Sequence, residues 1–364
     1  MVTEDNEYPL MAFIANEGVA PKGDRFDRSA LVKNADSKKY KRTKYGDFIY
    51  SSNNLESGSI VLNKYGKASI SPVYSIFYPT NLADSDFIGR YFLRKDFIGQ
   101  MIRWRQGVVY GQWKIPEADF LNIDIYIPSK DEQEKIGQIL DKVDNTITLQ
   151  QRKLNSLQKL KKGILQKMFP KKGENITEIR FPEFSDAWKQ RELKEVVNFS
   201  RGQGLPWADV DDLNGQFECI LYGNLYTDYG TIIQNIKHKT NTDLKVKSKG
   251  NEVLIPGSDT TPTGLARALF LEKENVILGG DINILSVKHD DGPFLAYELN
   301  KLKKELIIRI KGTTVKHLQH NDLKDIVVSL PSLEEQRKIS SLFSRLDNTI
   351  TLQQRWLFYT HKQS

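Results

Sequence analysis

The 364-residue sequence has one cysteine, five histidines and no long apolar run. The single cysteine, Cys219, excludes an internal disulfide framework and a four-cysteine zinc ribbon, and is typical of a reducing compartment. A membrane helix needs about 20 consecutive apolar residues, and the runs here span only a few, so no membrane span is expected. The acidic opening MVTEDNEYPL lacks the basic and then apolar pattern of a signal peptide. We therefore expect a cytoplasmic protein.

Charge is abundant and leans to the basic side. Apolar residues make up 39% and charged residues 27%, which is the composition of a folded chain. Fifty-three Lys and Arg against 46 Asp and Glu give a net charge of +7. This balance favours a polyanionic partner, most simply nucleic acid, without requiring one. Residues 145–173 contain eight basic and no acidic residues. Such a run could lie over DNA, face an acidic partner or be solvated.

An internal repeat organises the chain. Residues 127–154 read IPSKDEQEKIGQILDKVDNTITLQQRKL, and residues 330–357 read LPSLEEQRKISSLFSRLDNTITLQQRWL, at a constant offset without a gap. The nine residues 144–152 are identical to residues 347–355. The chain is therefore a duplication of a unit of roughly 200 residues, each a variable globular part followed by the shared segment.

The shared segment predicts a long helix. Pro128 and Ser129 stand where helices begin, with Ser129 as N-cap and acidic residues in the first turn. Steps of four and three then define a seam of the coiled-coil type, which reads Ile136, Leu140, Val143, Ile147, Gln150, Leu154, Leu157, Lys161, Ile164 and Met168. The second copy keeps this register with Ile339, Phe343, Leu346, Ile350, Gln353 and Leu357.

A helix from Asp131 to Phe169 would be about 58 Å long, and Pro170 and Gly173 end it. Its apolar stripe must be buried, and the obvious mate is the duplicate helix in an antiparallel pair. The alternative is that each helix packs on its own domain. The second copy loses the pattern after Leu357, and the lead-in at 181–202 has no counterpart in the first copy. We therefore expect the chain to begin late and end early relative to an ideal duplication.

The globular parts combine short β-like runs with helical stretches, so we predict an α+β fold of two mixed α/β domains. Each part closes with a polar stretch, a short apolar run and a proline. We expect four segments, namely a first globular domain (1–127), a first long helix (128–170), a linker with the second globular domain (171–330) and a second, shorter helix (331–364).

The repeated EQxKI and DNTITLQQR runs, the KLKKGILQKMFP continuation and the RFPEF…W lead-in resemble a known family. Over essentially its whole length the chain is similar to the DNA specificity subunit, or S subunit, of type I restriction-modification systems. The resemblance implies that the globular parts are target recognition domains, each reading one half of a split DNA sequence. It also implies that the helices pair antiparallel and space the halves. Because the two domains differ in sequence, the two half-sites should differ.

The resemblance implies a non-catalytic targeting protein inside a larger enzyme. Its expected partners are double-stranded DNA, two modification (methyltransferase) subunits and, through the complex, restriction (translocase and nuclease) subunits, with no cofactor and no membrane. In that family the repeated helices dock the modification subunits, which makes the EQxKI turns candidates for partner docking through Glu132, Gln133, Lys135, Glu335, Gln336 and Lys338. The alternative is that these residues only start a helix.

Two basic segments at matching places are candidates for contact with the phosphate backbone. The segment SKKYKRTK offers Lys38, Lys39, Tyr40, Lys41, Arg42 and Lys44. Its counterpart IKHKTNTDLKVKSK offers Lys237, His238, Lys239, Lys245, Lys247 and Lys249. The alternative is a pair of solvated loops.

Two further segments, near the end of each domain, are candidates for base contacts. The first, MIRWRQGVVYGQWK, offers Arg103, Trp104 and Arg105, and arginine is the usual bidentate reader of guanine. Its counterpart, RIKGTTVKHLQHND, offers Thr313, Thr314, Lys316 and His317. The alternative is that Trp104 and Trp113 belong to the core.

The sequence offers no recognisable catalytic centre. The glycine pair Gly257 and Gly264 lacks the Lys-Ser/Thr of a phosphate loop, and His317 and His320 lack a third metal ligand. Neither an Asn-Pro-Pro-aromatic run nor a nuclease-like carboxylate pair is evident. Two alternatives stay open: a methyltransferase or nuclease with an unrecognised motif, and a truncated or defective S subunit that acts as a structural adaptor without DNA recognition.

Overall fold

A computed structural model describes residues 7–21, 39–108, 112–171 and 173–363 of the chain. Contacts divide it into two units, residues 1–146 and 147–364, with the boundary inside the long helix α4 (Lys130–Met168). No helix in the described part of the chain is both long and apolar enough to span a membrane.

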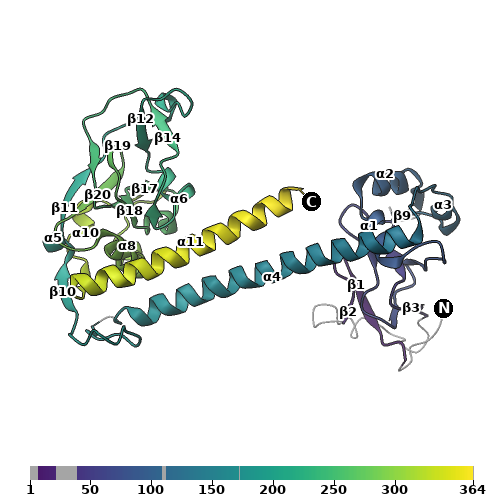
Figure 1. Cartoon of the computed structure of the whole chain (residues 1–364). Helices are drawn as coiled ribbons and strands as arrows, with labels where there is room; N and C mark the ends of the chain where they lie inside the picture. Colours follow the sequence, from purple (N-terminus) through teal and green to yellow (C-terminus); the bar gives the residue numbers. More distant parts are fainter. Residues whose placement is uncertain (1–6, 22–38, 109–111, 172, 364) are drawn as a thin grey trace. The chain divides into compact units, whose positions relative to one another are not determined.

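Unit 1 combines several small sheets with three short helices and the start of α4 (Figure 1). Its strands are β1 (Met11–Ile14), β2 (Gly18–Pro21), β3 (Lys41–Thr43), β4 (Phe48–Tyr50), β5 (Ile60–Leu62), β6 (Ala68–Ile70), β7 (Ser75–Phe77), β8 (Gln106–Val108) and β9 (Gln112–Lys114). Its short helices are α1 (Ser85–Phe92), α2 (Lys95–Arg103) and α3 (Glu117–Leu121). β4 is the central strand of a three-stranded antiparallel sheet between β5 and β7.

Aromatic residues fill the core of unit 1. Phe48 of β4 lies 4.5 Å from Phe92 of α1 between ring centroids, and Phe92 stacks on Phe97 of α2 at 4.3 Å. Phe120 of α3 packs on the same group, 5.9 Å from Phe48. One cluster therefore joins the sheet to all three short helices, which is the mixed α/β arrangement that the sequence predicts.

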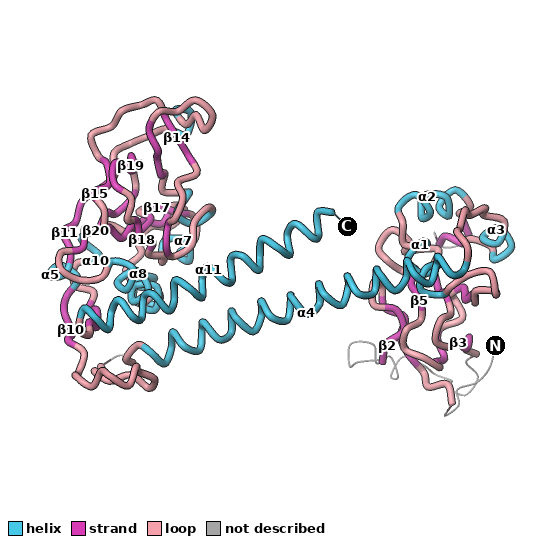
Figure 2. Tube along the Cα trace, in the orientation of Figure 1, coloured by secondary structure: helices cyan, strands magenta, loops and turns pink. Residues whose placement is uncertain are grey.

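Unit 2 is larger and contains two main sheets, of strand order β11-β20-β16-β18-β13 and β14-β12-β19-β15 (Figure 2). Its strands are β10 (Lys189–Glu192), β11 (Val197–Arg201), β12 (Phe217–Ile220), β13 (Ile232–Ile233), β14 (His238–Thr240), β15 (Lys247–Lys249), β16 (Glu252–Pro256), β17 (Ser258–Asp259), β18 (Leu269–Leu271), β19 (Glu274–Leu278), β20 (Ile282–Val287), β21 (Lys316–His317) and β22 (Val327–Leu330). Its helices are α5 (Leu193–Val196), η5 (Trp207–Asp209), α6 (Asn224–Thr227), α7 (Pro262–Leu265), α8 (Gly292–Lys301), α9 (Lys303–Ile308), α10 (His320–Leu323) and α11 (Leu333–Gln363).

The two long helices pair antiparallel within unit 2, which confirms that part of the predicted fold. Leu154 of α4 packs with Ile350 and Leu357 of α11. Farther along α4, Lys161 forms an ion pair with Asp347, which lies earlier in α11. Residue numbers therefore rise along one helix and fall along the other, and Figures 1 and 2 show the two helices side by side over this stretch.

The C-terminal end of the apolar seam of α4 packs into the core of unit 2, so the helix pair does not form a coiled coil separate from the domain. Met168 and Phe169 pack with Phe343 of α11 and with Phe294 of α8. The ring of Phe169 stacks on that of Phe294 at 5.3 Å between centroids. Helix pairing and packing on the domain, which the sequence left as alternatives, are therefore both realised along one helix.

Candidate nucleic-acid interface

The lysines predicted in unit 2 lie on the two edge strands of one sheet. β14 carries Lys239, with Lys237 just before it, and β15 carries Lys247 and Lys249, with Lys245 just before it. These two strands flank β12 and β19 in the four-stranded sheet. Residues separated along the chain therefore mark opposite borders of a single sheet.

Two of these five lysines are held by acidic and aromatic neighbours. The ammonium of Lys247 lies 2.6 Å from a carboxylate oxygen of Asp243 and 4.7 Å from the centre of the Phe217 ring. The ammonium of Lys237 lies 3.5 Å from Asp228 and over the ring of Tyr229. Both contacts keep the positive charge at a defined place on the sheet.

The other three, Lys239, Lys245 and Lys249, are exposed, and within the described residues their ammonium groups form no ion pair. Exposed and unpaired ammonium groups are the form in which lysine binds phosphate oxygens with the release of counterions. The prediction of phosphate contact stays open for all five lysines, and the geometry favours these three.

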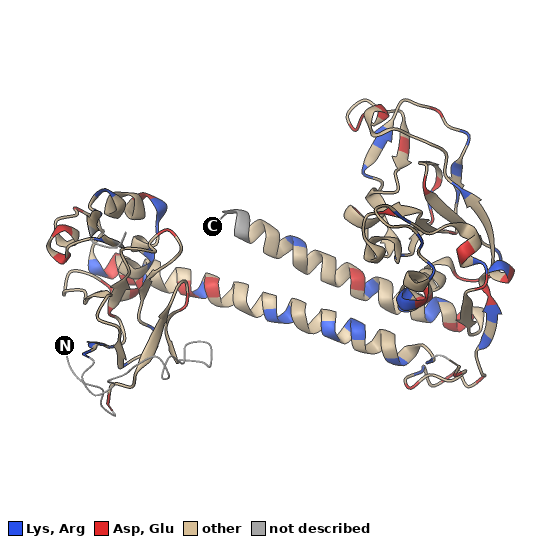
Figure 3. Cartoon of the chain, turned by 180° about the vertical axis from the view of Figure 1, so that it is seen from behind, with Lys and Arg blue, Asp and Glu red and all other residues tan. Residues whose placement is uncertain are grey.

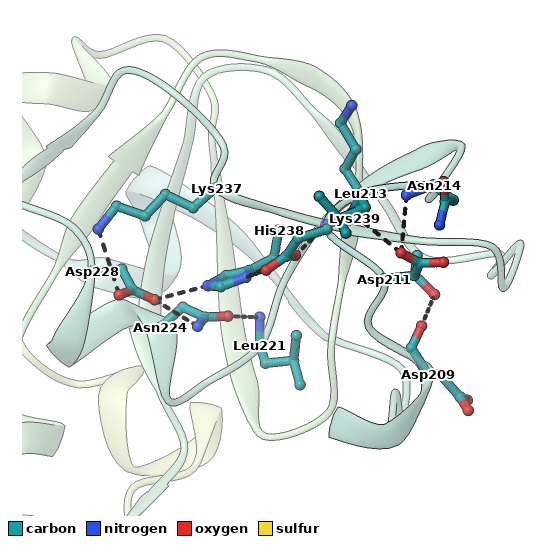
Figure 4. A network of polar contacts seen from close by, with 12 residues as sticks. Asp209, Asp211, Leu213, Asn214, Leu221, Asn224, Asp228, Lys237, His238 and Lys239 are labelled. Atoms are coloured by element: carbon teal, nitrogen blue, oxygen red, sulfur yellow. Dashed lines mark hydrogen bonds and ion pairs between the residues drawn. The ribbon is translucent and has the colours of Figure 1, made fainter.

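A histidine clamp positions the β14 edge (Figure 4). Nδ1 of His238 lies 3.1 Å from both carboxylate oxygens of Asp212, and Nε2 lies 3.2 Å from Asp228. Burial acts to raise the pKa of Asp228, but hydrogen bonds from His238 and Asn224, together with the charge of Lys237, outweigh it and lower that pKa. Strand β14, helix α6 and the loop that contains Asp212 are tied together at this point.

The predicted residues Thr313 to His317 belong to a polar double loop. β21 pairs with β17, which places His317 opposite Ser258, and the two side chains contact at 3.0 Å. Thr313 and Thr314 are exposed at the tip of their loop, whereas Lys316 donates to the carbonyl of Gly312 at 2.8 Å. The β17–β21 pairing brings a second threonine-rich loop beside the predicted one.

Sequence reasoning missed this second loop, which exposes Thr260, Thr261 and Thr263. Asp259 shapes it by accepting hydrogen bonds from the Thr260 amide at 2.6 Å and the Thr261 hydroxyl at 2.8 Å. A Cβ on Gly264 would stand 1.6 Å from a carboxylate oxygen of Asp259, so a larger residue there would force the Asp259 side chain to move. The segment lacks the lysine of a phosphate loop, but its threonine hydroxyls can both donate to and accept from DNA.

Some of the predicted residues of unit 1 have partners within the protein, and others are exposed to solvent. Lys38 lies outside the described residues. Lys41 donates to the Tyr74 carbonyl at 2.8 Å and to Glu117 at 3.1 Å. Arg105 is nearly buried and bonds Glu56 at 2.9 Å. Arg42 lies over the ring of Tyr8. These three cations serve the fold of unit 1.

Of the other five predicted residues of unit 1, four are exposed, namely Lys39, Lys44, Arg103 and Trp104, and Tyr40 is half-buried. Lys39, Lys44 and Arg103 form no ion pair in the part of the chain described here. The ring of Trp104 is 41% exposed and that of Trp113 49% exposed, so the alternative of core tryptophans is wrong. An exposed tryptophan next to an arginine, as at Trp104 and Arg103, is typical of a surface that contacts the bases or sugars of DNA.

Partner docking through the EQxKI turns needs correction for three of its six residues. Gln133, Glu335 and Gln336 are at most 1% exposed, so they cannot contact a partner directly. Gln133 accepts from the amide of Asp84 at 2.9 Å, and Gln336 accepts from the amide of Asp291 at 2.9 Å. Each glutamine fastens the start of a long helix to the N-cap residue of a short one.

The third buried residue, Glu335, forms two parallel hydrogen bonds of 2.8 Å with the guanidinium of Arg180. Lys338 binds Glu183 at 2.7 Å and lies over Phe184. The lead-in that contains RFPEF is therefore attached to α11 by this motif. Of the six residues, only Glu132 and Lys135 are exposed without an ion pair among the described residues.

The run of cations on α4 points outward. Figure 3 colours the lysine and arginine positions along this stretch blue on the ribbon. Lys161 pairs with Asp347, whereas the exposed members with no ion pair among the described residues are Arg152, Lys153, Lys159, Lys162 and Lys167. In the described chain, no three His, Cys, Asp or Glu side chains are grouped so that they could hold a metal ion.

Comparison with known proteins decides the family. The type I restriction modification DNA specificity domain matches this chain twice, at residues 3–159 and 185–357. The chain belongs to this DNA specificity family. Each match runs from a globular part into one of the long helices, so the specificity domain and the internal repeat coincide.

Relatives of this specificity chain include two proteins of one organism. The type I restriction enzyme MjaVIII specificity subunit of Methanocaldococcus jannaschii is 26% identical over 269 residues, which cover 66% of this chain and 60% of that protein. The MjaIX specificity subunit of the same organism is 22% identical over 253 residues, or 66% of this chain and 57% of that protein. The matched stretches thus span less than two thirds of either relative.

The fold of this specificity chain also has a solved counterpart. The S subunit of a type I restriction-modification system from M. genitalium matches with a TM-score of 0.59 at 15% identity. The match covers 98% of this chain and 86% of that chain. The two-domain fold with long helices is therefore shared with that structure.

Proposed function

We propose that this chain is the DNA sequence-recognition subunit of a type I restriction-modification complex and performs no catalytic step of its own. The observation that carries the proposal is the double match to a DNA specificity domain, with one domain in each half of the chain. The two globular parts differ in sequence, whereas the helical segments are nearly identical. Each domain accordingly reads a different half of a split, asymmetric DNA target.

In unit 2 we assign contact with the phosphate backbone to Lys239, Lys245 and Lys249, because these cations are exposed and unpaired within the described residues. We assign base-edge contacts to the two threonine loops, which contain Thr261 and Thr314. In unit 1, Arg103 and Trp104 take the corresponding role. Lysine contacts set register and orientation, and hydroxyl and guanidinium contacts with base edges select sequence.

The same proposal includes protein partners. Relatives are named as specificity subunits of restriction enzymes, and we infer that this chain likewise binds two modification subunits and, through them, restriction subunits. The outward face of the long helices, including Glu132 and Lys135, is the surface we assign to this docking.

Selection from a random library of DNA duplexes tests the function. The chain is co-expressed with its modification subunit, and bound duplexes are sequenced after washing at moderate salt. We expect a split motif with two different halves at fixed spacing. Replacing residues 1–127 by the corresponding domain of another specificity subunit should change one half and leave the other intact. An intact complex that enriches no motif would identify a structural adaptor instead.

Salt dependence tests the lysine assignment. Lys239→Ala/Lys245→Ala should weaken binding to all duplexes alike and reduce the slope of log affinity against log salt by about 1 for each lost phosphate contact. The matched control Lys303→Ala/Lys304→Ala removes the same charge from exposed positions on α9. Equal slopes for both double variants would contradict the assignment.

A further inference from the structure

Both ring nitrogens of His238 face carboxylates, and this decides the charge of the ring. Nδ1 lies 3.1 Å from each carboxylate oxygen of Asp212, and Nε2 lies 3.2 Å from an oxygen of Asp228 (Figure 4). A carboxylate only accepts hydrogen bonds, and a neutral imidazole carries a proton on one nitrogen alone. Only the imidazolium form of His238 can donate to both aspartates, so this arrangement belongs to the protonated ring.

Among the described residues around this ring, His238 is the group that titrates near neutral pH. Cys219 stands opposite it on β12, and burial raises the pKa of that thiol to about 11. Tyr229, whose hydroxyl accepts from the Lys237 amide, has its pKa raised to about 12 by burial. Aspartates and the flanking Lys237 and Lys239 keep their charges over the interval in which histidine titrates. The charge of this site therefore changes by one unit with the proton of His238.

Two outward side chains depend on the same clamp. Asp212 accepts from the backbone amide of Lys239 at 3.2 Å as well as from His238, and the Lys239 side chain is exposed. The ring of Trp207 lies edge-to-face against that of His238, with 5.2 Å between centroids, although Trp207 is 60% exposed. Trp207 beside Lys239 therefore gives unit 2 an exposed aromatic next to a cation, as Trp104 does in unit 1.

Loss of the proton would open the clamp. The side chain of His238 is only 14% exposed, so water cannot easily replace a lost partner. One ring nitrogen would then turn a lone pair toward the carboxylate of Asp212 or Asp228, and repulsion would replace a charge-assisted hydrogen bond. The charge beside Lys239 would also become one unit more negative. Both changes weaken the attraction of this surface for phosphate.

We propose that His238, as an imidazolium, is the positioning residue of the DNA-binding surface of unit 2, and that Trp207 is a DNA contact that it holds in place. Unit 2 then binds its half of the target more tightly when the ring is protonated, and the affinity falls as the pH rises and the ring loses its proton. This inference rests on the proposed function and adds to it a contact residue and a pH dependence.

Fluorescence anisotropy with a labelled duplex tests the proposal. The protein is the full chain in complex with its modification subunit, the duplex carries the motif returned by the library selection, and affinities are measured at fixed salt from about pH 6 to about pH 8.5. His238→Gln should bind about tenfold more weakly than the unaltered complex at the acidic end, the size expected for one hydrogen bond to a charged group, and match it at the alkaline end.

Two further variants separate positioning from general stability. Asp212→Asn should flatten the pH profile, because an amide can donate to the bare nitrogen of a neutral His238 ring while its oxygen still accepts from the Lys239 amide. The matched control His289→Gln removes an exposed histidine outside the clamp and should leave the profile unchanged. Trp207→Ala should weaken binding about fivefold or more at the acidic end, and Trp207→Phe should restore most of that loss.

A profile equally steep with and without His238→Gln would overturn the role of His238, as would a loss of affinity that is the same at every pH. If circular dichroism shows that His238→Gln perturbs folding, Asp212→Asn decides, and a profile that it leaves steep contradicts the proposal. Unchanged affinity of Trp207→Ala would remove Trp207 from the DNA contacts. A library selection without any motif would overturn the proposed function and this inference together, whereas a clear motif with a flat pH profile would overturn this inference alone.

Discussion

At the scale of single residues, two buried glutamines perform the same task in the two halves. Gln336 accepts from the Asp291 amide, and its own amide donates to Asp290 at 2.8 Å and to the Pro331 carbonyl at 3.0 Å. Gln133 makes the equivalent bond to the carbonyl of Pro128 at 2.8 Å. A side chain that both donates and accepts is required, which explains why glutamine recurs at this point of the repeat.

Gln336→Ala should lower the free energy of unfolding by about 1–3 kcal/mol, because buried polar groups lose their partners. Urea unfolding followed by circular dichroism measures the loss. Gln158→Ala, at an exposed position of α4, should change stability by less than about 0.5 kcal/mol. Equal effects of the two substitutions would show that the buried hydrogen bonds contribute nothing.

Glu298 is a buried carboxyl whose surroundings favour the neutral form over the charged one. Burial raises its pKa to about 7, against the opposing charge of Lys301 and a hydrogen bond from the Ser329 amide. One of its oxygens has no hydrogen-bond partner among the described residues. Since the unfolded chain releases this proton near the ordinary pKa of glutamate, the folded state holds the extra proton between those two values.

Stability should therefore fall as the pH rises from about 4.5 to about 7 and level off above it, with a slope of up to about 1.4 kcal/mol per pH unit from this group. Glu298→Gln should remove that part of the slope and be more stable than the unaltered chain at pH 8. Urea midpoints at several pH values measure it, with exposed Glu272→Gln as the control. A slope unchanged by Glu298→Gln would refute the assignment.

At the scale of secondary-structure elements, the identical run 144–152 and 347–355 reflects shared contacts. Asp144 binds Arg90 of α1 at 2.6 Å, and Asp347 accepts from the Tyr297 hydroxyl of α8 at 2.9 Å. The side-chain amide of Gln353 donates to the side-chain oxygen Oε1 of its own counterpart, Gln150. Where equivalent residues of α4 and α11 contact each other across the antiparallel pair, both copies need the same side chain at that position.

The helix pair is expected to depend on its inner leucine. Leu154→Ala should lower the free energy of unfolding by about 2–3 kcal/mol, because it opens a gap against Ile350 and Leu357. Leu149→Ala removes the same atoms from a side chain that is 62% exposed and should change stability by less than about 0.5 kcal/mol. Thermal unfolding of both variants makes the comparison, and similar losses would argue against the pair seen within unit 2.

At the scale of the whole molecule, the two units have separate cores. Met101 is fully buried among the aromatic residues of unit 1, and Leu254 is fully buried between strands of unit 2. Each of the described apolar clusters draws its residues from one unit alone. Independent cores allow independent unfolding.

Differential scanning calorimetry should accordingly show two transitions. Met101→Ala should lower one midpoint by several degrees, since a buried Met→Ala change costs about 2–5 kcal/mol. Leu254→Ala should lower the other, and each variant serves as the control for its counterpart. One transition that both substitutions shift equally would mean that the units unfold as one cooperative body.

The candidate site was only partly readable from the sequence. The basic character of residues 237–249 was visible, but no pattern shows that Lys247 lies beside Asp243 while Lys245 stays unpaired. The loop that contains Thr261 was missed, because the β17–β21 pairing that joins its strand to the strand after Thr314 spans more than fifty residues of sequence. Such long-range pairing leaves no local signal in either segment.

The duplication, the length and start of the long helix and the mixed domains followed from the sequence, because repeats, caps and apolar periodicity are local properties of the chain. Tertiary structure alone decided which polar side chains are buried and hydrogen-bonded inside the fold. Gln336 and Glu335 read as surface residues at a helix start, yet they are buried. Burial depends on which distant segments, here α8 and the lead-in with Arg180, pack over a side chain. The local spacing of residues in the sequence does not show which distant segments will pack there.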